Sequence, residues 1–222
     1  GVNALRVRHF LENGGILWLW AMAGNDASKG QEIVATSENT IEGGGRVQWP
    51  MANGELGVTS HLRKTPSMGF TGTVAEDDLL ESRIALDGRW DIGVGLWFES
   101  VLIDQGSSAA NNYRHQTTLG SDYTFGFGNG LYVVAEHQIT QFSNHVLVWD
   151  SPDQTSVLHI RYPLNLLDSL SALSTVQWTD DIRTAHHVSW QRVYDNWIVQ
   201  FSGFNRSNPN TYGVQGTVVF NH

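Results

Sequence analysis

The 222-residue sequence contains no cysteine, few charged residues and no long hydrophobic run. Without cysteine the chain can form neither a disulfide framework nor a thiolate metal site. Its longest apolar stretch, Ile16–Ala23, is far shorter than the roughly 20 residues that a transmembrane helix needs. A helical membrane protein is therefore excluded.

Positive charge is also scarce. The sequence has only two lysines, Lys29 and Lys64, and its formal net charge is −9. Nucleic acid is not an expected partner, because binding to phosphates requires clustered lysine and arginine. Charged residues make up only 16% and aromatic residues 11%, which argues against a disordered chain.

The dominant positive signal is an alternation of apolar and polar residues with a period of two. The clearest example is the segment Asp91–Glu99. One face would carry Ile92, Val94, Leu96 and Phe98, and the other Asp91, Gly93, Gly95, Trp97 and Glu99. Successive side chains of a strand point to opposite faces, so this pattern predicts β-strands and not helices.

Short turn motifs alternate along the chain with longer polar stretches. The expected tight turns are at 12–15, 52–55, Asp87-Gly88, 128–130 and 195–196, where Asn-Gly and Asp-Gly pairs favour hairpins. The longer stretches, rich in Gly, Ser, Asn and Asp, are 24–45, 65–80, 104–112 and 143–155. Tight turns on one side and long loops on the other are typical of outer-membrane barrels.

The chain is expected to be all-β and to form one antiparallel transmembrane β-barrel domain over residues 1–222, with about 13 strands. The expected strands are 2–11, 15–24, 44–51, 55–64, 81–87, 89–103, 113–126, 130–142, 155–163, 168–179, 183–194, 196–206 and 212–221. Bacterial barrels have an even number of strands. We therefore expect that at least one N-terminal strand precedes Gly1, which would make about 14 in the closed barrel.

In this pattern, which covers nearly the whole chain, the sequence resembles a Gram-negative outer-membrane β-barrel of the porin kind. Its last segment, Tyr212–His222, is similar to the alternating, phenylalanine-containing final strand of such barrels. The resemblance implies a protein of the bacterial outer membrane, in contact with outer-membrane lipid and lipopolysaccharide, that lets small polar solutes or ions diffuse passively. It also implies no enzymatic activity, no cofactor and no metal, and allows a homo-oligomer or a larger complex.

Arginines dominate the face that would line a pore, and neutral side chains fill in between. An arginine-rich wall opposite carboxylates is what a water-filled lumen would present to ions and polar solutes. The expected pore-lining residues are Arg6, Arg8, Arg46, Arg63, Arg83, Asp91, Glu99, Arg114, Asp122, Glu136, Arg161 and Arg206. A weak preference for anions is the corresponding hypothesis.

Aromatic residues lie near the ends of the expected strands or on their apolar face. Amphipathic rings settle at the headgroup level of a membrane and form girdles around a barrel. The expected membrane-interface aromatics are Trp18, Trp20, Trp49, Trp90, Trp178, Trp190, Trp197, Tyr212 and Phe220.

Three other interpretations remain open. The chain could be a soluble all-β carbohydrate-binding module, with its tryptophans in a core or on a binding face, or a structural barrel subunit of an outer-membrane complex. His187 and Ser189, two apart on one expected strand, have the spacing of a catalytic pair, but no orienting third group is identifiable. The nine histidines are scattered, so no metal site is expected.

Overall fold

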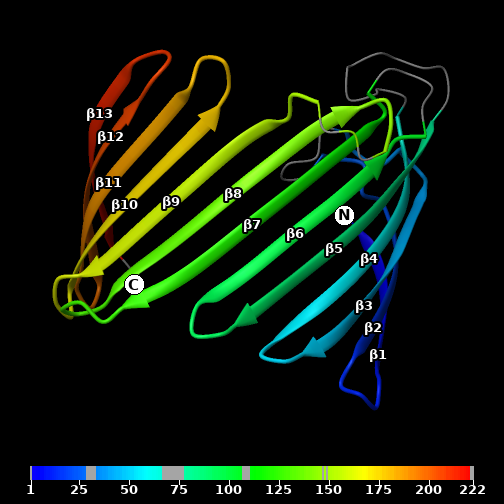
Figure 1. Cartoon of the computed structure of the whole chain (residues 1–222), viewed down its shortest axis with the longest axis horizontal. Coiled ribbons are helices and arrows are strands. Elements are labelled where there is room, and N and C mark those ends of the chain that lie inside the picture. The colour runs from blue at the N-terminus through cyan, green and yellow to red at the C-terminus, as the bar shows by residue number, and fades with distance from the viewer. Residues whose placement is uncertain are drawn as a thin grey trace. The chain divides into compact units, whose positions relative to one another are not determined.

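The computed structural model describes residues 2–28, 34–66, 78–106, 111–146, 148 and 150–220, which form thirteen strands in one antiparallel sheet. Consecutive strands lie side by side in chain order (Figure 1). The strands are β1 (Asn3–Phe10), β2 (Ile16–Ala23), β3 (Ile41–Met51), β4 (Gly54–Thr65), β5 (Leu79–Asp91), β6 (Gly95–Asp104), β7 (Tyr113–Phe125), β8 (Leu131–Ser143), β9 (Asp153–Pro163), β10 (Asp168–Trp178), β11 (Arg183–Val193), β12 (Trp197–Arg206) and β13 (Thr211–Phe220).

The prediction of an all-β chain with thirteen strands is confirmed, and most strand ends lie within two residues of their expected positions. No helix long and apolar enough to cross a membrane occurs among the described residues.

The sheet is open, which differs from the expected closed barrel. Within the described residues, β1 pairs only with β2 and β13 only with β12. Because the number of strands is odd, β1 and β13 run in the same direction. Pairing them directly could not complete a fully antiparallel ring.

The chain divides into two compact units. Unit 1 comprises Gly1–Asp91, Trp97–Thr117 and Thr140–Pro152, and unit 2 comprises Ile92–Leu96, Thr118–Ile139 and Asp153–His222.

The strand register separates two faces in unit 1. One cross-strand row, which defines the charged face, consists of Arg6, Trp20, Gly44, His61 and Arg83. The adjacent row, which defines the apolar face of this unit, consists of Val7, Leu19, Gly45, Ser60 and Ile84. Side chains directly opposite each other in a sheet share a face. The alternation of polar and apolar residues along these strands therefore places the charged side chains of unit 1 on one face and the apolar ones on the other.

The same segregation holds in unit 2. Its polar face includes the row Arg161, Ser171, Ser189, Ser202 and Gln215. Its apolar face includes the neighbouring row Tyr162, Leu170, Trp190, Phe201 and Gly216. In this unit, the register therefore aligns aromatic and aliphatic side chains on one side and hydroxyl and amide groups on the other.

The expected turn at Asp87-Gly88 is wrong. β5 continues to Asp91, and the connection to β6 lies at 92–94, where Gly93 has a φ of 90°. Asp87 and Gly88 pair instead with Gly57 and Leu56 in the ladder. A Cβ atom on Gly88 would lie 2.4 Å from the Trp90 ring, so this glycine makes room for an aromatic side chain and not for a turn.

The tight turn between β3 and β4 provides a test of the local fold. Asn53 in this turn has a φ of 59°, a conformation that asparagine and glycine tolerate and β-branched residues do not. Asn53→Val is expected to lower the free energy of unfolding by about 1–2 kcal/mol, and Asn53→Gly to change it little. Equal effects of the two substitutions in a denaturant titration would contradict this explanation.

Candidate functional site

The distribution of burial in this protein is inverted relative to that of an ordinary globular domain. Among the described residues, Ile103 is the one buried large apolar side chain, at 8% exposure. The ten buried polar residues are Thr36, Ser37, Glu42, Arg63, Thr65, Glu81, Gln105, Gln141, Asp168 and Ser189. Globular proteins bury aliphatic residues and rarely bury arginine or glutamate, so the polar side of this sheet is the candidate functional surface.

The first cluster on the charged face is centred on Arg46. The Arg46 guanidinium donates two hydrogen bonds to Asp87, from Nη1 to Oδ1 at 2.5 Å and from Nη2 to Oδ2 at 2.7 Å. Nη1 also donates to the Thr59 hydroxyl at 3.0 Å. This two-point geometry holds the guanidinium in a fixed orientation across β3, β4 and β5.

A second cluster joins two arginines to one carboxylate. Glu81 Oε1 accepts from Arg63 Nε at 2.7 Å and from Arg83 Nε at 2.6 Å, and Arg63 Nη2 lies 3.3 Å from Oε2. Arg63 and Glu81 are each only 2% exposed. A buried ion pair is tolerated only when hydrogen bonds satisfy both partners, which this shared carboxylate provides.

A third cluster surrounds Glu42, which is 2% exposed. Its carboxylate accepts hydrogen bonds from Asn25 Nδ2 and Thr36 Oγ1, both at 2.8 Å, and lies 3.4 Å from His61 Nε2. Trp20 Nε1 donates to His61 Nδ1 at 3.1 Å, so the ring proton of a neutral His61 belongs on Nε2, facing Glu42.

Part of the connection between β2 and β3 lies against these clusters. Arg63 Nη2 donates to the Val34 carbonyl at 2.9 Å, and Ser37 N donates to the Lys64 carbonyl at 2.8 Å. Together with the hydrogen bond from Thr36 to Glu42, these contacts hold residues 34–37 against the charged face of unit 1.

The remaining predicted pore-lining residues of unit 1 are more weakly engaged. Arg6 and Arg8 lie over aromatic rings, those of Trp18 at 5.9 Å and Phe10 at 4.7 Å. Asp91 ends β5 on the same side as Asp87, and Glu99 lies within electrostatic reach of Arg46. Arg114 donates a hydrogen bond to Gln116 at 3.0 Å. The structure therefore brings together Arg46, Arg63 and Arg83, with their carboxylates.

In unit 2, the predicted pore-lining residues are dispersed. Asp122 Oδ2 accepts a hydrogen bond from the Tyr132 hydroxyl at 2.8 Å. Glu136 lies on the same side of β8 as Tyr132, by alternation along the strand. Arg161 belongs to the polar row, and Arg206 lies on the same side of β12 as Ser202. These four side chains are not brought into one cluster.

The predicted interface aromatics divide between the faces. Trp18 and Trp20 pair with Arg46 and Gly44 and lie on the charged face of unit 1. The segment Ile16–Ala23 is apolar on both sides, so its alternation does not indicate which face these two residues share. The aromatics on the apolar faces are Trp49, Trp90, Trp178, Trp190, Trp197, Tyr212 and Phe220.

Sequence reasoning did not single out the groups that hold the clusters together. Glu42 lies in the expected polar stretch 24–45 and Glu81 begins the expected strand 81–87, but neither these residues nor His61 is among the expected pore-lining residues. A signal was available for one of them, because Glu81 and Arg83 share a side of one strand. Glu55 was also overlooked, although it accepts from Gln48 and pairs with Arg89.

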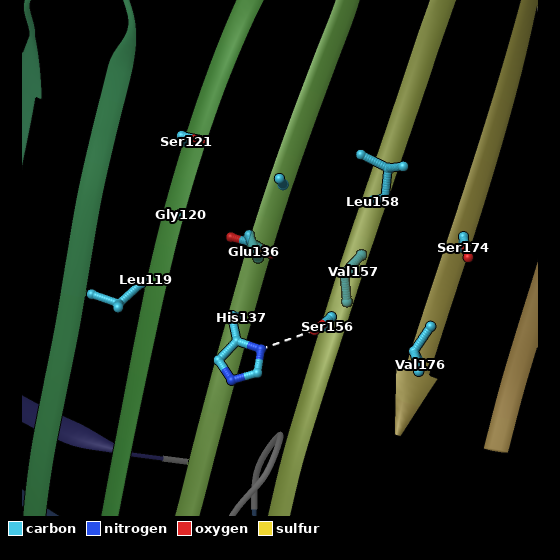
Figure 2. Close-up of a pocket in the computed structure, with 11 residues that line it drawn as sticks. Leu119, Gly120, Ser121, Glu136, His137, Ser156, Val157, Leu158, Ser174 and Val176 are labelled. Atoms are coloured by element: carbon cyan, nitrogen blue, oxygen red, sulfur yellow. Dashed lines mark hydrogen bonds between the residues drawn. The ribbon is translucent and has the colours of Figure 1, made fainter. Parts of the chain in front are cut away.

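A shallow groove lies on the apolar face of unit 2, with a volume of about 540 Å³. Figure 2 shows His137 and Ser156 facing each other within it, joined by a hydrogen bond of 2.9 Å from Nδ1 to Oγ. Trp178 Nε1 also hydrogen-bonds Ser156 Oγ, at 2.8 Å. In the part of the chain that the structure describes, His137 Nε2 has no orienting partner, so the pair lacks the third group of a catalytic triad.

The other candidate for catalysis, His187 with Ser189, lies on the polar face of unit 2. Ser189 Oγ is 2.9 Å from Ser171 Oγ, and no hydrogen bond between Ser189 and His187 is present among the described residues. Nor do three histidine or acidic side chains converge as metal ligands in the described ranges.

Comparisons with protein-family models, with curated proteins and with solved structures gave no match. The function is therefore inferred from the geometry of the chain itself.

Proposed function

We propose that the chain forms the wall of an outer-membrane β-barrel of the porin kind, which lets small polar solutes or ions diffuse across the bacterial outer membrane. In this proposal the charged and polar faces meet water in the lumen, and the apolar faces meet lipid and lipopolysaccharide. Arg46, Arg63 and Arg83 with their carboxylates form a rigid part of the lumen wall.

One observation carries the proposal: apolar side chains are exposed on a sheet whose other face holds buried ion pairs. In unit 1, where those ion pairs lie, Val7 is 56% exposed, Leu19 51% and Ile84 58% on the apolar face. A sheet in water hides such a face against a second layer, yet the described residues form one sheet only. Hydrocarbon is the solvent that tolerates this face without a second layer.

The two edge strands add a requirement. In a bilayer, unpaired backbone groups along β1 and β13 would each cost several kcal/mol. The proposal therefore requires further strands, about one if the barrel has fourteen, or a second copy of the chain, to cover both edges.

Reconstitution tests the proposal directly. The purified protein should require detergent to stay monodisperse, and liposomes that contain it should swell in an iso-osmotic solution of a small sugar. Protein-free liposomes and liposomes with heat-denatured protein are the controls. A monodisperse protein in plain buffer would overturn the membrane assignment, and insertion without swelling would favour a structural barrel subunit.

A further inference from the structure

Arg114, on β7 in unit 1, is a half-buried arginine whose charge no carboxylate balances among the described residues. Its Nη2 donates to the Gln116 side-chain oxygen at 3.0 Å, and its Cζ lies 5.8 Å from the centre of the Phe142 ring. Its Nε is buried and has no hydrogen-bond partner in the part of the chain that the structure describes. An amide and an aromatic ring orient the guanidinium but do not neutralise it.

The other arginines of the charged face differ from Arg114. Arg46 is paired with Asp87, and both Arg63 and Arg83 with Glu81. Arg6 and Arg8 lie on the first strand and are exposed to solvent. Among the described residues, Arg83 and Glu81 are the charged groups that affect Arg114 electrostatically, and Glu81 is already bonded to two guanidiniums. The surroundings of Arg114 therefore retain an excess of positive charge.

A partly buried cation without a counter-charge is unfavourable, and a buried donor without a partner commonly marks the place of a ligand or an ion. The planar guanidinium presents its donors as a fork that matches the oxygens of a carboxylate or a phosphate. The Gln116 side chain accepts from Arg114 through its oxygen, so its amide NH₂ group stays available as a further donor.

We infer that Arg114, with Gln116 as a second donor, binds an oxyanion, that is, a carboxylate or phosphate group of a solute on the charged face. This inference rests on the proposed function, because the solute would reach Arg114 through the lumen. Arg114 contacts the anion through the edge of its guanidinium that carries Nε and Nη2, of which Nε has no hydrogen-bond partner among the described residues. Phe142 and the Gln116 oxygen position the guanidinium.

Inorganic phosphate is the probe for the test, with acetate and chloride as comparison anions. Binding is measured by calorimetry on the detergent-solubilised protein, and selectivity by the reversal potential of reconstituted protein in a salt gradient. Arg114→Gln is expected to weaken phosphate binding about tenfold or more, because charge-assisted hydrogen bonds are lost. Arg114→Lys keeps the charge but not the fork, and should recover only part of the affinity.

Arg161→Gln is the matched control, because Arg161 is an exposed arginine of the polar face of unit 2. It removes the same charge and should leave phosphate affinity unchanged. Far-ultraviolet circular dichroism shows whether each variant keeps its strands. An equal loss in the Arg114→Gln and Arg161→Gln variants, or equal affinities of the wild type for phosphate and chloride, would overturn the inference.

The binding and current measurements separate this inference from the proposed function. Phosphate binding that depends on Arg114 in a protein that carries no current would support the oxyanion site and contradict the pore. A conducting protein whose phosphate affinity survives Arg114→Gln would support the pore and overturn the site.

Discussion

Glu81→Gln is expected to lower the free energy of unfolding by about 3–5 kcal/mol, the cost of breaking a buried ion pair by removing one partner. The substitution keeps the size of the side chain and removes the charge that Arg63 and Arg83 share. Both Arg63 and Glu81 are 2% exposed, so water cannot replace the lost interaction without rearrangement. The loss of this ion pair should therefore appear in full as a lower free energy of unfolding.

Glu55→Gln is the control for this measurement. Glu55 pairs with Arg89, which is 75% exposed, and an exposed pair contributes about 0–1 kcal/mol. Urea titrations of both variants under identical detergent conditions give the two differences in unfolding free energy. Similar losses at the two positions would show that the Arg63–Glu81–Arg83 cluster is not held as a buried unit.

Val214→Arg is expected to cost about 2–4 kcal/mol, the range for arginine on the lipid face of a barrel near the bilayer midplane. Val214 is 90% exposed and lies within β13 on the apolar face of unit 2. An exposed position in a water-soluble protein would tolerate the same change within about 0.5 kcal/mol. The substitution therefore distinguishes hydrocarbon from water as the solvent of this face.

Gln215→Arg supplies a matched control on the next residue of the same strand. Gln215 is also exposed but belongs to the polar face of unit 2. Under the proposal it faces the lumen, and an arginine there should be nearly neutral for stability. Folding yield into lipid vesicles and unfolding free energy both measure the difference. Equal effects of the two arginines would contradict the assignment of lipid and water to opposite faces.

The sequence was sufficient to predict the strands because the signal for a strand is local. Alternation with a period of two places side chains on opposite faces whatever the strand pairs with. The segment Tyr212–Phe220 illustrates this, since its predicted and observed bounds differ by one residue at each end. The alternation did not reveal the faces around Trp18 and Trp20, where both are apolar. It also predicted one strand through 92–94, where the structure has the connection between β5 and β6.

Turn chemistry was a weaker guide. Asn53 turns the chain as expected, whereas the Asp87-Gly88 pair, with a similar local signal, continues a strand. What distinguishes them is tertiary contact, because Asp87 is bonded to Arg46 and Gly88 lies against the Trp90 ring. Neither contact can be read from the two residues alone.

The sequence alone therefore determined that this is an all-β chain with one charged and one apolar side to its strands, because those properties follow from neighbouring residues. Only the tertiary structure decided that the sheet is open and which arginines are neutralised. Arg63 and Glu81 are 18 positions apart and Arg46 and Asp87 are 41 apart, so each pair forms only once the register aligns separate strands. Among the described residues, the tertiary structure gives Arg114 no carboxylate partner, which composition alone could not indicate.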